Sequence, residues 1–286
     1  MPLSSSSSAT SSTSLPSPFF LYGTAWKEDL THSLTEQAIK AGFRGIDTAN
    51  QRKHYFEEAV GQGILSSYQN LNLHRSDLWI QTKFTHQAGQ DHRLPYDPKA
   101  PIYDQVMSSF ASSLTHLHTD YIDSYVLHGP SLRSGLADQD WEAWRAMEDL
   151  HRQGQVKVLG VSNMSAEQLR LLIKGCTIKP KYIQNRCFAQ LKWDREVRLI
   201  CQEHDLIYQG FSLLTANRQV WESQVVDQLA RKYECTSAEI IFSLALDLKM
   251  LPLTGTSDPT HMTSDLRSKA GLLSEQEVEF LENIYM

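Results

Sequence analysis

Hydrophobic and polar positions along this chain follow a repeating order, in which a short apolar run precedes a longer segment with helical spacing. Short runs rich in β-branched and aromatic residues predict strands, and apolar residues at every third or fourth position predict amphipathic helices. The runs that predict strands cover residues 19–22, 44–47, 78–81, 124–127, 157–161, 181–184, 206–209 and 250–253.

The segments between these runs predict helices. Their ends carry local signals: Gly42 is a natural helix stop, and Ser165 with Gln168 forms the capping-box pattern of a helix start. The predicted helices include residues 30–41, 102–117, a segment over 141–150, a helix that opens at 165, and a last helix over 275–284.

The order of these elements predicts the fold class. Strands that alternate with helices in one chain are typical of parallel sheets joined by crossover helices. Eight alternations favour a closed α/β barrel, a single (β/α)8 TIM barrel over residues 19–286, and an open doubly wound sheet is the competing architecture. The Ser-rich residues 1–18 lack the basic end and apolar run of a secretory signal, so we expect a disordered tail there.

Composition excludes several classes of partner. The net charge of −6 gives no basic footprint for nucleic acid, and no apolar stretch is long enough for a membrane helix. The four cysteines are far apart in sequence and are expected to be buried thiols rather than metal ligands or a redox pair. We therefore expect a cytoplasmic protein without a metal, while its oligomeric state is unknown from sequence.

Polar residues stand where three of the predicted strands end. Asp47 ends the second, Lys83 follows the third and His128 follows the fourth. In a barrel these strand ends are neighbours on one rim, and charged residues rarely enter such places unpaired. We expect Asp47 and Lys83 to pair there.

Several segments resemble the aldo-keto reductase family. Residues 42–49 with 55–61, residues 121–130 and residues 154–163 are similar to its signatures and occur in the family's order. The resemblance runs from Gly23 and Thr24 to the C-terminus. It implies the barrel fold and NAD(P)H-dependent reduction of a small aldehyde or ketone to an alcohol.

The resemblance also implies a catalytic tetrad of Asp47, Tyr55, Lys83 and His128. Most members carry the tyrosine at the position that Arg52 occupies here. Residues 50–55 look like a small insertion, after which the family pattern resumes, so the tyrosine is assigned to Tyr55. A crippled site, in which Tyr55 only packs, is the alternative.

The implied reaction gives these side chains distinct roles. Reduced nicotinamide gives hydride to a carbonyl carbon, and the oxygen must receive a proton. A free phenol has a pKa of about 10, and the Lys83 ammonium is expected to lower the pKa of Tyr55. Asp47 would hold Lys83, and His128 would donate a hydrogen bond to the carbonyl oxygen.

The chain lacks the glycine-rich fingerprint of a Rossmann fold after its first strand. By resemblance, the cofactor-binding residues are instead Thr24, Ser162, Asn163, Gln184, Phe211, Ser212, Leu213, Gly255, Thr256 and Ser257. Phe211 would stack on the nicotinamide ring. Many relatives grip the 2′-phosphate of NADPH with Lys and Arg after the eighth strand, where this chain has Asp258 and His261. The family's habit favours NADPH, with NADH as the alternative.

Substrate contacts are expected at the rim, from Trp26, Phe84, His86 and Trp193, with ordinary packing as the alternative. The long connection over residues 85–100 is either a lid or wall at this rim or a plain surface insertion. The last predicted helix leaves little chain to close over a large substrate, which predicts an open mouth.

Two other functions compete with reduction. The first is a cofactor-binding regulatory protein on the same fold that lacks turnover. The second is a different barrel enzyme, such as a sugar-phosphate isomerase, which would bind no nicotinamide.

Overall fold

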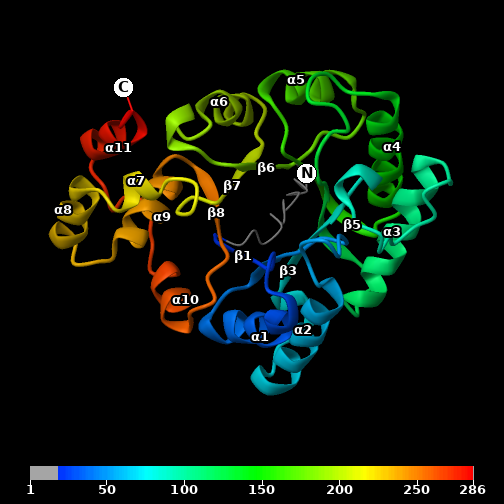
Figure 1. Cartoon of the computed structure of the whole chain (residues 1–286), viewed down its shortest axis with the longest axis horizontal. Helices are drawn as coiled ribbons and strands as arrows, with labels where there is room; N and C mark the ends of the chain where they lie inside the picture. Colours follow the sequence, from blue (N-terminus) through cyan, green and yellow to red (C-terminus); the bar gives the residue numbers. More distant parts are fainter. Residues whose placement is uncertain (1–18, 286) are drawn as a thin grey trace, which may run out of the picture.

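The computed structural model describes residues 19–285 and shows a closed barrel of eight parallel strands (Figure 1). Each strand pairs with the next in sequence, and β8 closes the barrel by pairing with β1. The strands are β1 (Leu21–Gly23), β2 (Gly45–Asp47), β3 (Trp79–Phe84), β4 (Ile122–Leu127), β5 (Val156–Ser162), β6 (Tyr182–Arg186), β7 (Ile207–Phe211) and β8 (Met250–Thr254). The predicted (β/α)8 barrel is confirmed, and the open sheet is excluded.

Helices form the outer ring (Figure 1). They are α1 (Thr31–Ala41), α2 (Glu57–Leu71), α3 (Ile102–His116), α4 (Asp138–Arg152), α5 (Ala166–Gly175), α6 (Arg195–Glu203), α7 (Arg218–Trp221), α8 (Gln224–Lys232), α9 (Ser237–Asp247), α10 (Pro259–Asp265) and α11 (Glu275–Glu282). Short 3₁₀ turns are η1 (Glu28–Leu30), η2 (Arg75–Asp77), η3 (Gln87–Gly89) and η4 (Ala189–Leu191). The expected tail over residues 1–18 lies outside the described residues.

Local signals in the sequence set the helix ends. Gly42 closes α1 with a φ of 120°, a conformation that residues with a Cβ rarely adopt. At the start of α5, the Ser165 hydroxyl accepts a hydrogen bond from the Gln168 amide, and the Gln168 side chain accepts one from the Ser165 amide. The predicted capping box is therefore present.

Strand β4 begins at Ile122, earlier than the apolar run predicts, because the buried Asp123 is fully paired there. Its carboxylate accepts hydrogen bonds from Arg75 at 2.7 Å, from Lys157 at 2.8 Å and from the Ile80 amide at 2.9 Å. A paired carboxylate can occupy a strand that an unpaired one would break. Sequence periodicity alone does not show such partners.

The barrel interior is layered along the strands. Side chains alternate with a period of two, so Trp79, Gln81 and Lys83 of β3 enter successive layers. The first layer is an apolar cluster in which Trp79 contacts Tyr182 at a ring separation of 5.2 Å. The second is polar and contains Gln81 and Gln209, and the Lys83 amine lies at the carboxyl ends. The layering therefore places charged groups at the carboxyl-terminal rim, where the active sites of such barrels lie.

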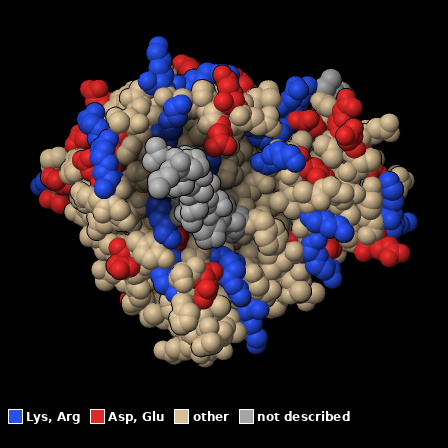
Figure 2. All heavy atoms as spheres, turned by 180° about the vertical axis from the view of Figure 1, so that it is seen from behind, with Lys and Arg blue, Asp and Glu red and all other residues tan. Residues whose placement is uncertain are grey.

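The surface carries both signs of charge. On the face seen from behind in Figure 2, Lys and Arg side chains are interspersed with Asp and Glu side chains. None of the helices within residues 19–285 has the length and apolar composition needed to cross a membrane.

Candidate active site

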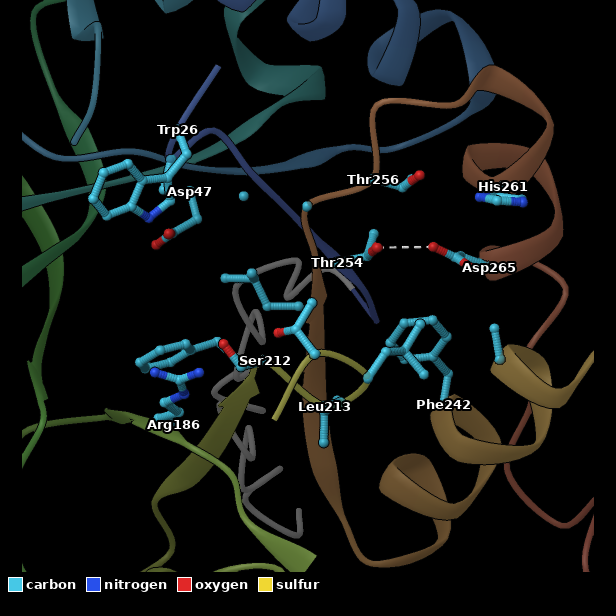
Figure 3. A pocket seen from close by; sticks show the side chains of 18 of the residues that line it. Trp26, Asp47, Arg186, Ser212, Leu213, Phe242, Thr254, Thr256, His261 and Asp265 are labelled. Carbon is cyan, nitrogen blue, oxygen red and sulfur yellow. Dashed lines mark hydrogen bonds between the residues drawn. The ribbon is translucent and has the colours of Figure 1, made fainter. Parts of the chain in front are cut away.

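A cavity of about 990 Å³ opens at the carboxyl ends of the strands. Its walls come from the ends of β1, β2, β6, β7 and β8 and from α9 and α10 (Figure 3). Small-molecule sites have volumes of roughly 300–1,000 Å³ and occur on this face of the fold. This cavity is therefore the candidate active site.

The structure brings Asp47 and Lys83 together. The buried Lys83 amine donates hydrogen bonds to both carboxylate oxygens of Asp47, at 2.7 and 2.8 Å, and to the Thr48 carbonyl at 2.8 Å. An ammonium group has three N–H donors, so all of them are used. Asp47 lines the cavity, and Lys83 lies behind it.

Tyr55, and not Arg52, lies beside this pair. Tyr55 lines the cavity, with the Lys83 amine 5.1 Å from the centre of its ring. Within the described residues its hydroxyl has no hydrogen-bond partner. Arg52 instead pairs with Glu28 at 3.0 Å. Of the two candidate positions, Tyr55 is therefore the one that lines the cavity, and its catalytic role stays a prediction.

His128 packs its ring against Tyr55, with 5.9 Å between the ring centres. Its Nδ1 atom lies 2.7 Å from the Thr85 hydroxyl, and its backbone carbonyl accepts a hydrogen bond from the Asn163 side chain at 2.8 Å. Burial, with a further contribution from Lys83, lowers the pKa of His128 to about 3. The imidazole is therefore neutral at ordinary pH.

The pKa of Tyr55 moves in the direction opposite to the expectation. Burial raises it, and the negative charge of Asp47 raises it further. The Lys83 amine gives the phenol no hydrogen bond, because its donors are directed at Asp47 and Thr48. Tyr55 is consequently a protonated phenol at neutral pH.

Two glutamines support Asp47: Gln184, which the sequence analysis assigned to cofactor binding, and Gln81, which it did not single out. Gln81 donates to Asp47 Oδ1 at 2.6 Å and to the Gln209 side chain at 2.9 Å. Gln184 donates to the same Asp47 oxygen and to Gln209, each at 3.0 Å. The period of two on β3, which places Gln81 on the face of Lys83, could have indicated this role.

Six of the residues expected to bind the cofactor line the cavity, namely Gln184, Phe211, Ser212, Leu213, Gly255 and Thr256. The other four lie just outside its wall. The hydroxyl of Thr24 donates to the Asp47 carbonyl at 2.9 Å, and that of Ser162 donates to the Gln184 carbonyl at 2.6 Å. Asn163 contacts His128, and Ser257 contacts Lys27.

Lys27 is a lining residue that sequence reasoning missed. Its amine donates hydrogen bonds to the Gly255 carbonyl and to the Ser257 hydroxyl, so it lies against the loop after β8. Burial lowers the pKa of Lys27. Its place directly after Trp26, a residue expected at the rim, was the available signal.

Of the expected substrate residues, Trp26 alone lines this cavity. It is 71% exposed, with its indole 4.1 Å from the His54 ring. Phe84 is buried, and His86 lies 3.1 Å from the Asp140 carboxylate. Neither reaches the cavity.

Trp193 lies away from the cavity as well. It is buried, and its indole donates to the Leu281 carbonyl in α11 at 2.9 Å. The connection over residues 85–100 also contributes no lining residue, and the Tyr96 hydroxyl ties it to the Thr85 carbonyl at 2.7 Å.

Comparisons with known proteins point to one family. The model of the Aldo/keto reductase family matches residues 22–286. The chain is 31% identical over 204 residues to the glyoxal reductase of Bacillus subtilis, a match that covers 71% of this chain and 65% of that protein, slightly under two thirds of its length. It is 28% identical over 285 residues to the NADPH-dependent alpha-keto amide reductase of Saccharomyces cerevisiae, covering 90% of this chain and 83% of that protein. The crystal structure of an aldo/keto reductase from Brucella melitensis superimposes with a TM-score of 0.79 at 26% identity, covering 93% of this chain and 95% of the other.

Proposed function

This chain belongs to the aldo/keto reductase family, and we propose that it reduces small aldehydes or ketones to alcohols with NADH or NADPH, with Tyr55 as the general acid. The observation that carries the proposal is the Tyr55 phenol, which has no hydrogen-bond partner among the described residues and shares one cavity with Asp47. A polar group held in this way next to an ion pair is available to a ligand.

The residues of the cavity fit a nicotinamide dinucleotide. Phe211 offers a flat aromatic face, Gln184 is an amide on the same wall, and Lys27 is a cation beside the loop after β8, where a diphosphate would be held. When bound, the reduced nicotinamide supplies hydride to the carbonyl carbon. NADPH is the cofactor that the resemblance predicts, and NADH is the alternative.

Tyr55 delivers the proton in the proposed reaction. Burial keeps the proton on the phenol until the substrate oxygen gains negative charge and becomes the stronger base. The proton then moves from the Tyr55 hydroxyl to that oxygen. The Lys83 amine, 5.1 Å from the ring, stabilises the phenolate that remains.

His128 orients the substrate oxygen in this proposal. When the Thr85 hydroxyl donates to Nδ1, the ring proton resides on Nε2, which leaves one N–H on a ring that packs against the cavity residue Tyr55. Asp47 keeps the Lys83 amine fixed and charged through its two hydrogen bonds. These groups hold their places before the reaction, so they need no reorganisation during it.

The substrate class follows from the mouth of the cavity and from the relatives. Trp26 is exposed at the rim and can contact an apolar group of the substrate. The relatives are named for glyoxal and for alpha-keto amides, both compounds with adjacent carbonyl groups. We therefore propose small dicarbonyl compounds and other reactive aldehydes as substrates.

The test is to mix the full-length protein with NADH or NADPH and glyoxal, and to follow the loss of reduced-nicotinamide absorbance. We expect loss that requires the protein and the carbonyl compound. Dinucleotide binding without loss for a panel of aldehydes and ketones would favour the regulatory protein without turnover. Absence of dinucleotide binding would favour a different barrel enzyme.

A further inference from the structure

The end of the cavity opposite Asp47 is formed by β8, α9 and α10. Figure 3 shows that the side chains gathered there are Phe242, Thr254, Thr256, His261 and Asp265. The proposed function places the nicotinamide beside Tyr55. The adenosine half of a dinucleotide bound in this way would then lie toward the opposite end of the cavity.

Asp265 contributes a buried carboxylate to this end. The residue is 2% exposed, and one of its oxygens accepts a hydrogen bond from the Thr254 hydroxyl at 2.8 Å (Figure 3). Within residues 19–285 no lysine, arginine or histidine forms an ion pair with it. Burial raises the pKa of Asp265 to about 6, so the group is charged above that pH. A buried charge without a cationic partner is unfavourable unless a ligand brings donors to it.

Asp265 forms no ion pair with the lysine or the arginine of the cavity. Among the described residues, the lysine and arginine that line it are Lys27, held at the loop after β8, and Arg186, which lies on the side of Asp47 in Figure 3. Arg267 follows α10, but its side chain is 64% exposed and pairs with Glu239 at 3.0 Å. Apart from Lys27, whose amine is held by the residues on either side of Thr256, His261 is the basic side chain that lines the adenosine end among the described residues.

We propose that this end of the cavity selects NADH over NADPH, and that Asp265 determines the preference. The adenosine of NADH carries hydroxyl and amino donors, which suit a carboxylate. The 2′-phosphate of NADPH instead brings negative charge and acceptors, and it needs an arginine or lysine. Placed near Asp265 without one, it meets like charge where water is scarce. This inference rests on the proposed function and replaces the NADPH preference that the resemblance implies.

The test measures binding rather than turnover. The full-length protein is titrated with NADH and with NADPH at about pH 8, with quenching of tryptophan fluorescence as the readout. We expect NADH to bind at least about tenfold more tightly. Equal binding, or tighter binding of NADPH, would overturn the proposal.

Two variants identify the residue responsible. Asp265→Asn is expected to lower the ratio of the NADPH and NADH dissociation constants by about tenfold, mainly because NADPH binds more tightly. His261→Arg should strengthen NADPH binding and leave NADH binding nearly unchanged. Asp104→Asn, which removes an exposed carboxylate on α3, is the matched control and should leave the ratio unchanged. An unaltered ratio in both cavity variants, each folded by circular dichroism, contradicts the role of Asp265.

The same titration separates this inference from the proposed function. Selective NADH binding by a protein that reduces no carbonyl compound would remove the reductase proposal and leave the selectivity. Turnover with equal binding of both dinucleotides would remove the selectivity alone.

Discussion

At the scale of single residues, one turn decides which side chain reaches the position of the proposed acid. The Gln51 carbonyl accepts hydrogen bonds from the His54 and Tyr55 amides, at 3.2 and 3.0 Å. This turn absorbs the insertion and places Tyr55 on the cavity wall, while Arg52 pairs with Glu28 outside it. The position of the phenol depends on this backbone geometry.

Replacing Tyr55 with Phe removes the transferable proton and keeps the ring. We expect Tyr55→Phe to lower the rate of reduction by about 10²-fold or more, because a positioned acid contributes about that much. Dinucleotide affinity, measured by fluorescence titration, should be unchanged. Arg52→Ala is the control and should keep full activity. If Arg52→Ala lost activity and Tyr55→Phe kept it, Tyr55 would not be the acid.

The partly buried His128 makes a prediction about pH. Its pKa of about 3 lies far below the ordinary value of about 6.5, so we expect no step in kcat/KM near pH 6.5 from this group. Below about pH 6.5 His128 binds a proton in the unfolded chain but stays neutral in the folded chain. His128 therefore lowers the free energy of unfolding as pH falls from about 6.5 toward 3. Urea unfolding of native protein and His128→Gln at several pH values measures this. A step in kcat/KM near pH 6.5 that disappears in the variant would contradict the kinetic prediction, and the same pH dependence of unfolding in both proteins would contradict the stability prediction.

At the scale of elements, helices α2 and α3 are joined through a buried carboxylate and a close backbone approach. Glu57, the first residue of α2, accepts hydrogen bonds from Ser113 at 3.1 Å and lies 2.9 Å from His116 Nδ1, both on α3, and it also accepts one from Thr82 on β3. Gly61 stands where α2 meets the end of α3. Both contacts fix the helices that cover the third strand, which carries Lys83.

Gly61 offers a direct test of this packing. A Cβ atom at this position would lie 1.9 Å from the His116 carbonyl oxygen, which is backbone and cannot move without shifting a helix. We expect Gly61→Ala to lower the free energy of unfolding by about 1–3 kcal/mol or more, although alanine favours helices. Gln62→Ala, on the exposed side of α2, is the control and should be neutral or stabilising. If Gly61→Ala and Gln62→Ala had the same free energy of unfolding in urea, α2 and α3 could move apart to fit the added methyl group without loss of stability.

At the scale of the whole molecule, the barrel encloses a polar layer between its apolar base and its charged rim. Gln81 donates to Asp47 and Gln209 and accepts a hydrogen bond from Ser124 at 2.9 Å, while Gln184 completes the layer. Each of these side chains comes from a different strand, so closure of the barrel is what assembles them. Buried polar groups of this kind are stable because they satisfy one another.

Breaking this layer should reduce stability. Gln81→Met keeps a similar volume but removes the donors and the acceptor, so Gln209 and Ser124 lose a buried partner. We expect a loss of about 1–3 kcal/mol in the free energy of unfolding, measured in urea. Gln62→Met on the surface is the control. An unchanged free energy for Gln81→Met would mean that other groups satisfy the partners it leaves.

Much of the fold and part of the site could be predicted from local sequence. The periods of two and of three to four set the strands and helices, and the polar residues at strand ends marked Asp47, Lys83 and His128. Residue spacing could not place side chains that depend on distant partners. Trp193 and His86 follow predicted strands and were expected at the rim. The Trp193 indole instead donates to the Leu281 carbonyl, and the His86 ring contacts the Asp140 carboxylate, so neither side chain reaches the cavity.

The sequence by itself determined the alternation of elements, the barrel that eight such units form, and the family that its signatures resemble, because all three follow from short-range pattern. Tertiary structure alone decided the state of the groups inside the site. It directs all three donors of Lys83 away from the phenol, brings Lys27 to the loop after β8, and leaves Asp265 without a cationic partner among the described residues. Hydrogen bonding and desolvation act over a few ångströms between residues far apart in the chain, so only the closed barrel sets them.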